Sequence, residues 1–183
     1  MKTGLMNTFN IKLHLNKGFS LIELLVVVAI IGILAAIGII AYNGYMASVK
    51  KKMTIAQHNK IVEIVTFGVK QCRSRIAEEI QLKHYEGWNR ESTDWYLDCK
   101  KDEGVYRNYY GLHFPALKWK NFYNFPNPFD ANNPSCCYAR DGDIWHLGMT
   151  IIGIEGGNIT VRTDTDGTVE GRLKEIIEFE RIK

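Results

Sequence analysis

A long uncharged run near the start of the chain constrains its fold more than any other feature. Between Phe19 and Tyr42 only Ser20 and Glu23 interrupt the apolar residues, and the 18 residues from 24 to 41 carry no charge. A helix rises about 1.5 Å per residue, so this run is long enough to cross a hydrocarbon core of about 30 Å. The sequence therefore predicts a membrane-spanning helix.

Glu23 separates the possible interpretations of this run. A cleaved secretory signal has a shorter apolar stretch followed by a small-residue cleavage site, and no such site stands out after Ala41. A plain membrane anchor explains the run but not the acid, because an ionised carboxylate at mid-membrane costs about 2.5 to 3.5 kcal/mol. An acid that lies at the membrane interface remains an alternative.

The residues around this acid form a specific pattern. The segment "KGFSLIE", residues 17–23, leads into "AIIGILAAI", residues 29–37, and on to Tyr42 and Tyr45. Over roughly residues 17–46, the pattern resembles the prepilin signature of type IV pilins and pseudopilins, in which a membrane-embedded peptidase cuts between glycine and phenylalanine.

The resemblance implies roles for three residues. Gly18 is the expected last residue of a cytoplasmic leader, and Phe19 is the expected new, N-methylated N-terminus. Glu23 is the expected assembly residue, which pairs with the amine of a neighbouring subunit's Phe19, since a paired charge is tolerated where a lone one is unfavourable. Two alternatives stay open: Glu23 marks the membrane interface, or it neutralises the amine of its own chain.

Two features depart from the family pattern. Residue 40 is Ile where many major pilins have proline, which leaves Gly38 and Gly44 as the weaker points of the helix. The 18-residue leader is longer than that of the commonest subclass, and Met6 is an alternative start.

Beyond the span, apolar residues recur at three- and four-residue steps, which predicts an amphipathic continuation of the same helix. The predicted helix runs from about Phe19 to Gln71 and is about 80 Å long. His58 lies on its apolar stripe and is interpreted as a packed histidine rather than a ligand. The stripe comprises Val49, Met53, His58, Val62, Val65, Val69, Cys72, Ile76 and Ile80.

The segment between Tyr85 and Trp145 holds 15 of the 21 aromatic residues and all four prolines, without a sustained period. It is predicted to be a long, loop-rich connection. Residues 125–137, "FPNPFDANNPSCC", contain three prolines, which exclude a helix or a central strand. Most of the aromatic residues are expected in the core, with adhesion by an exposed subset as the alternative.

The C-terminal third predicts strands. The runs "LGMTIIGI" (147–154) and "NITVRT" (158–163) flank "EGGN", and "DTDG" precedes "TVEGRLKEIIEFERI" (168–182). Gly-rich and Asp-Gly connections between β-branched runs are hairpin signals, although "RLKEIIEF" also has helical spacing. The predicted fold class is α+β and pilin-like: a long N-terminal helix packed on an antiparallel sheet of three or four strands.

Four cysteines, Cys72, Cys99, Cys136 and Cys137, follow the span. On the exported side of a membrane, an even number of cysteines predicts disulfides, here two. A bond between the adjacent Cys136 and Cys137 would close a strained eight-membered ring. The sequence therefore predicts that Cys72 and Cys99 each join one member of that pair.

Other candidate chemistry is weak. Asp164, Asp166 and Gly167 resemble part of a calcium loop but lack its longer ligand series, so a plain hairpin turn is the preferred interpretation. The adjacent cysteines 136–137 with His146 suggest a thiolate nucleophile and its base, but disulfide formation is preferred. No catalytic residue, metal or cofactor is expected.

Charge argues against a dedicated nucleic-acid site. Lys2, Lys12 and Lys17 account for the net charge of +3, so the chain from Phe19 onward is neutral. No basic stripe is present that would neutralise phosphates.

The sequence therefore predicts a structural subunit, not an enzyme. It is expected in the bacterial inner membrane as a precursor, where prepilin peptidase/methyltransferase processes it. It is then expected to polymerise with itself at a pilus assembly platform into an extracellular pilus (fimbrium) for adhesion, motility or DNA uptake. The alternatives are a pseudopilin of a type II secretion system and, from another class, a membrane-tethered binding protein or enzyme. The predicted segments are the leader (1–18), the hydrophobic helix half (19–48), the amphipathic half (49–72), the aromatic-rich connection (73–145) and the sheet region (146–183).

Overall fold

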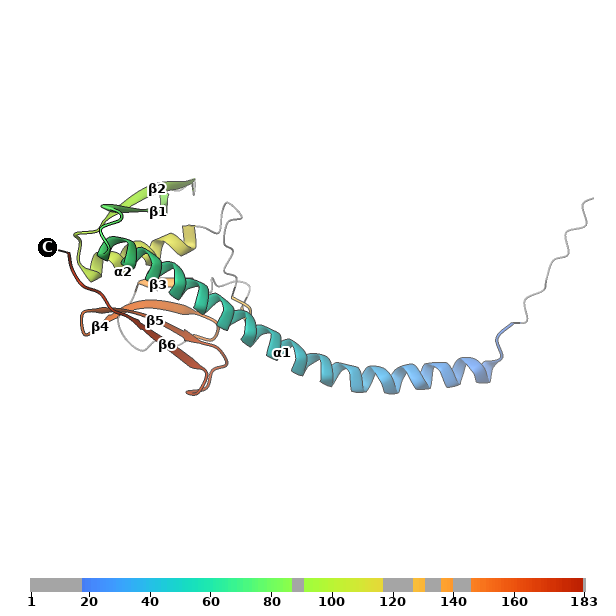
Figure 1. The fold of residues 1–183 in the computed structure, drawn as a ribbon. Helices are drawn as coiled ribbons and strands as arrows, with labels where there is room; N and C mark the ends of the chain where they lie inside the picture. The colour runs from blue at the N-terminus through green and yellow to red at the C-terminus, as the bar shows by residue number, and fades with distance from the viewer. Residues whose placement is uncertain (1–17, 87–90, 117–126, 131–135, 140–145, 183) are drawn as a thin grey trace, which may run out of the picture. The chain divides into compact units, whose positions relative to one another are not determined.

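The structure is a computed structural model that describes residues 18–86, 91–116, 127–130, 136–139 and 146–182. The chain divides into two compact units, Met1–Gly44 and Tyr45–Lys183. Helix α1, Leu21–Arg73, begins in the first unit and ends in the second (Figure 1). The helix predicted from Phe19 to Gln71 is thus confirmed to within two residues at each end.

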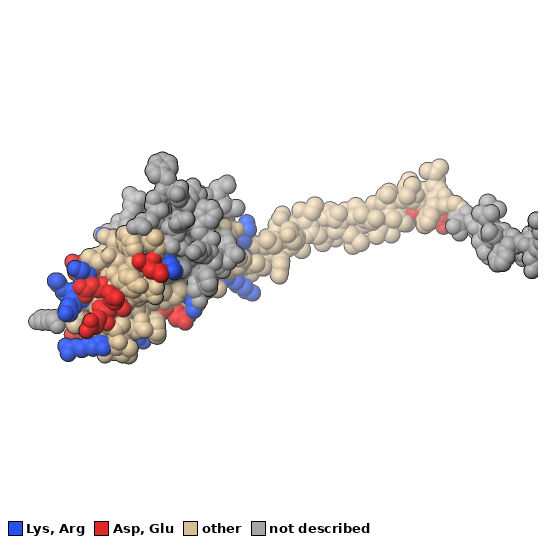
Figure 2. Space-filling view, turned by 90° about the horizontal axis from the view of Figure 1, so that it is seen from above, with Lys and Arg blue, Asp and Glu red and all other residues tan. Residues whose placement is uncertain are grey.

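In the first unit, every side chain of α1 is exposed within the chain. Figure 2 shows this part of the surface as almost wholly uncharged, whereas charged residues gather on the second unit. By length and composition, the helix is apolar enough to cross a membrane. It continues through Gly38 and Gly44 without a break.

In the second unit, α1 buries one face. Its buried residues are Thr54, His58, Ile61, Val65, Gly68, Val69 and Cys72. Four members of the predicted stripe are among them. Of the other five, Val49 and Val62 are partly buried, and Ile80 is buried beyond the end of the helix at Arg73. Met53 is 43% exposed, and Ile76, which also lies beyond the helix, is 76% exposed.

The C-terminal end of α1 is closed by a Schellman motif. The N–H of Arg75 donates to the carbonyl of Cys72 (2.9 Å), and the N–H of Ile76 donates to that of Gln71 (3.1 Å). Arg75 has φ of 53°, in the left-handed region where glycine is usual. This conformation costs a residue with a Cβ about 1 to 2 kcal/mol.

The main sheet has the strand order β3-β4-β5-β6. Strands β4 to β6 form the predicted antiparallel meander, and β3 is added to the edge in parallel with β4. The hairpin signal at Gly156 and Gly157 is confirmed, since both have positive φ between β4 and β5. The strands are β3 (Cys136–Ala139), β4 (Thr150–Glu155), β5 (Asn158–Asp164) and β6 (Arg172–Ile177).

The prediction of a loop-rich connection between Tyr85 and Trp145 is wrong for part of that segment. Strands β1 (Glu79–Glu86) and β2 (Glu91–Asp98) form an antiparallel hairpin, and helix α2 (Glu103–Ala116) follows it. Asp102 caps α2, because its Oδ1 accepts the N–H of Val105 at 3.0 Å. Tyr106, Tyr110 and Phe114 recur at four-residue steps, and each is at most 2% exposed.

One core joins these elements. Ile61 of α1, Leu97 of β2 and Ile159 of β5 are fully buried in a single apolar cluster, and Tyr110 of α2 is buried in the same cluster. Tyr110 lies against α1 at Gly68, where a Cβ would clash with the tyrosine hydroxyl. A glycine is therefore required for α2 to approach α1 this closely.

Candidate functional site

The start of α1 is closed by a pair of reciprocal hydrogen bonds. The backbone N–H of Ser20 donates to Oε2 of Glu23 at 2.8 Å, and the N–H of Glu23 donates to Oγ of Ser20 at 3.3 Å. This arrangement is a capping box, which satisfies N–H groups that have no partner within a helix. The Glu23 carboxylate also lies in the first turn, where the helix dipole favours a negative charge.

The sequence interpretation of Glu23 missed this local role. The spacing Ser-x-x-Glu before an apolar run is the recognisable sequence signal, and Ser20 is the residue it adds to the site. Pairing of Glu23 with a neighbouring subunit remains a prediction, and the capping box is a second role that any test of Glu23 has to separate from it.

Gly18 and Phe19 precede the helix. Residues 18–20 have no helical structure, and the Phe19 side chain is 82% exposed. A Cβ on Gly18 would meet nothing within 4 Å. The bond between the two residues is therefore accessible, and nothing in the described part of the chain requires glycine at position 18.

The comparison with protein families matches this segment. The model of the prokaryotic N-terminal methylation motif matches residues 13–39. The chain carries the type IV prepilin signature. No curated protein and no solved structure shows a significant match. The signature covers the junction at Gly18 and Phe19, the acid at Glu23 and most of the uncharged run, and it makes the chain similar to type IV pilins and pseudopilins.

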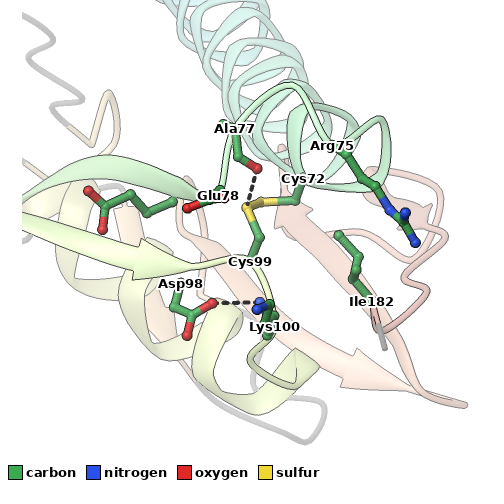
Figure 3. A pocket seen from close by; sticks show the side chains of 9 residues that line it. Cys72, Arg75, Ala77, Glu78, Asp98, Cys99, Lys100 and Ile182 are labelled. Carbon is green, nitrogen blue, oxygen red and sulfur yellow. Dashed lines mark hydrogen bonds between the residues drawn. A yellow bond between two sulfur atoms is a disulfide. The ribbon is translucent and has the colours of Figure 1, made fainter.

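The disulfide found in the structure differs from the predicted pairing. Cys72 and Cys99 are joined to each other, with Cα atoms 5.2 Å apart (Figure 3). The hairpin β1–β2 explains this, because it returns the chain to the end of α1, where the N–H of Cys99 donates to the carbonyl of Glu78 at 2.9 Å. The prediction that Cys72 and Cys99 each join one of the adjacent cysteines is therefore wrong. The side chains of Cys136 and Cys137 lie outside the described residues. His146 is exposed.

His58 is confirmed as a packed histidine. It is 2% exposed, and its Nδ1 lies 2.8 Å from Oγ1 of Thr163, which in turn lies 2.7 Å from Oγ1 of Thr150. Burial lowers the pKa of His58 below its usual value of 6.5, and the nearby charge of Glu175 opposes this shift. The histidine therefore joins α1 to the sheet through a buried polar chain.

The two aspartates of the "DTDG" segment serve a turn. Oδ1 of Asp164 accepts the N–H of Asp166 (3.2 Å) and of Gly167 (2.7 Å). Asp166 pairs with Nζ of Lys51 at 2.5 Å, which ties the turn to α1. Hydrogen bonds from Lys51 and then Thr168 lower the pKa of Asp166 to about 2. Within the described residues, no group of three or more His, Cys, Asp or Glu side chains is placed to hold a metal ion.

Proposed function

We propose that this protein is a type IV pilin, a structural subunit that polymerises with copies of itself into a surface filament. The prepilin signature at residues 13–39 carries the proposal. It coincides with a helical segment whose apolar side chains are not buried by any described part of the chain. Such a surface needs an apolar environment, which the inner membrane supplies to the precursor and neighbouring helices supply in a filament.

Processing is the first step of the proposed function. The leader, residues 1–18, lies in the cytoplasm, and prepilin peptidase removes it and leaves Phe19 as the methylated N-terminus. Intact-mass analysis of sheared filaments from cells that express the full chain tests this step, and retention of Met1 in a surface filament contradicts it.

Gly18→Val is the matched processing variant. Because a Cβ at this position meets nothing within 4 Å, the substitution leaves the fold unchanged. Failure of cleavage in Gly18→Val then reports recognition by the peptidase rather than misfolding. A membrane-tethered enzyme or binding protein would tolerate the substitution without loss of function.

Assembly is the second step. We propose that Glu23 pairs with the amine of a neighbouring subunit's Phe19, so that each charge is compensated only in the filament. The capping box provides the control. Glu23→Gln removes the charge but keeps an acceptor suited to the cap, whereas Ser20→Ala weakens the cap and keeps the charge.

If charge pairing drives assembly, Glu23→Gln loses filaments at normal levels of processed monomer, and Ser20→Ala keeps them. Normal filament yield from Glu23→Gln would refute the pairing.

Pseudopilins share the prepilin signature, so electron microscopy at native expression is the test that separates a pilin from a pseudopilin. Long surface filaments support a pilin, and their absence supports a pseudopilin.

A further inference from the structure

A hollow of about 870 Å³ lies beside the disulfide of the second unit (Figure 3). Cys72 and Cys99 both line it, and so does Ile182 near the C-terminus. The two cysteines are nevertheless only 2% and 4% exposed. There is thus room for a small molecule next to the bond, while the bond itself is almost covered.

The chain that follows β6 crosses several elements of this unit. Residues 178–182 have no regular secondary structure, and we call them the C-terminal strap. The N–H of Phe179 donates to Oδ1 of Asn158 at 3.1 Å, and the Phe179 ring meets the buried Tyr106 ring edge-on, with centroids 4.8 Å apart. Phe179 therefore anchors the start of the strap against β5 and α2.

The rest of the strap is held by weaker contacts. Arg73, at the end of α1, pairs with Glu180 at 3.3 Å and with Glu178 at 4.0 Å, and all three side chains are more than half exposed. Ion pairs as exposed as these contribute little to stability. Nε of Arg181 donates to the carbonyl of Lys100 at 3.4 Å, one residue after the disulfide. Segments held in this way open locally while the core stays folded.

We propose that the C-terminal strap is a gate that controls thiol–disulfide exchange at the bond between Cys72 and Cys99. Ile182 is packed against the core and lines the hollow, so the closed strap narrows access to the two sulfur atoms. Local opening of the strap admits a thiol to the bond without unfolding of the subunit. The inference goes beyond the proposed filament function and does not depend on it.

The reactant is a dithiol. One of its thiolates attacks a sulfur of the bond, which breaks; a mixed disulfide forms, and the other cysteine leaves as a thiolate that takes a proton from water. The second thiolate of the reactant attacks the mixed disulfide and releases the second cysteine, so the dithiol is oxidised to a disulfide and both cysteines are reduced. Sγ of Cys99 lies 3.3 Å from the carbonyl oxygen of Ala77, so its released thiol has an acceptor within reach.

Reduction of the folded full chain in detergent by dithiothreitol tests the gate. Alkylation followed by peptide mapping measures the rate at Cys72 and Cys99. Phe179→Ala removes the anchor of the strap and should speed reduction at least about tenfold. Gly68→Ala is the matched control, because a Cβ there clashes with Tyr110 and weakens the core but leaves the strap untouched. Its rate should stay within about twofold of wild type.

A shortened chain separates cover of the bond from packing of the core. Removal of residues 181–183 takes away Ile182 and the contact to Lys100 but leaves Phe179 in place. Reduction should be at least about fivefold faster, while the unfolding midpoint under oxidising conditions stays close to that of wild type. Unchanged rates in both strap variants, or an equal acceleration in Gly68→Ala, overturn this inference. A wild-type rate that rises with urea in parallel with the unfolded fraction also overturns it, because the bond would then be reached only by global unfolding.

Discussion

The two halves of α1 have one continuous backbone and opposite surroundings. Ile40 in the first unit is 77% exposed within the chain, whereas Ile61 in the second unit is fully buried. Burial of such a side chain stabilises by about 1.5 to 3 kcal/mol. The chain therefore stabilises the second half by its own core, while the first half depends on a membrane or on other molecules.

Loss of the disulfide should have the largest effect, confined to the second unit. Cys72→Ser/Cys99→Ser removes a bond that closes a 27-residue separation, which should lower the free energy of unfolding by about 3 kcal/mol. Chemical denaturation of the full chain in detergent measures this. An unchanged midpoint would contradict the assignment of the bond as a stabilising element of this unit.

Substitution of one glycine in each half of α1 compares how tightly the two halves are packed. Gly68→Ala forces a Cβ against Tyr110 and should cost about 2 kcal/mol through overpacking. Gly38→Ala meets nothing within 4 Å and should stabilise the helix by up to about 1 kcal/mol. The denaturation midpoint measures the effect of Gly68→Ala, and amide hydrogen exchange around residue 38 measures that of Gly38→Ala. Destabilisation at both positions would mean that the two halves are packed alike.

Acid should weaken only the second unit. The N–H of Lys83 donates to Nδ1 of His113 at 2.8 Å, and burial lowers the pKa of His113 from 6.5 to about 4. Between these values the unfolded chain binds more protons, so stability is complete above pH 6.5, falls as pH falls and levels off below about 4. The expected loss from pH 6.5 to pH 5 is roughly 1 to 2 kcal/mol.

His113→Gln is the control for this dependence. Its side chain keeps an acceptor for Lys83 but does not titrate, so the denaturation midpoint should vary less with pH. A pH profile identical to that of wild type would assign the acid sensitivity to other groups, His58 first among them.

The smallest expected effect is at the start of α1. Ser20→Ala removes one half of the capping box and should destabilise the first turn by about 1 kcal/mol, while Ser20→Thr should be nearly neutral. Amide hydrogen exchange of residues 21–24 measures this. The denaturation midpoint of the second unit should not change, because the cap lies in the other unit.

The sequence predicted the elements that have long or simple periods. The uncharged run, the apolar stripe of α1 and the hairpins around Gly156 and "DTDG" follow from patterns that few other structures produce. The hairpin β1–β2 was missed because Ile80 continues the four-residue spacing of α1, although Ile80 and Leu82 also alternate as in a strand. A short apolar run does not distinguish a helix from a strand, and tertiary contacts decide between the two.

The wrong disulfide pairing follows from that error. Without the hairpin, nothing placed Cys99 near Cys72, and the ring argument against Cys136–Cys137 then selected the wrong partners. Helix α2 was predictable from the capping residue Asp102 and the spacing of Tyr106 and Tyr110. The capping box of Ser20 and Glu23 was also predictable from the Ser-x-x-Glu spacing. The cost of a charge in the membrane favoured a partner for Glu23 outside the chain instead.

The hydrogen bond between His58 and Thr163 joins residues 105 positions apart, which has a consequence for the timing of synthesis. At about 5 to 20 residues per second, Thr163 is made some 5 to 20 seconds after His58. The hairpin and α2 depend on nearer contacts and are expected to form earlier. The last strands are thus made well after α1, and the side chains of α1 that they cover, His58 among them, stay exposed during this interval.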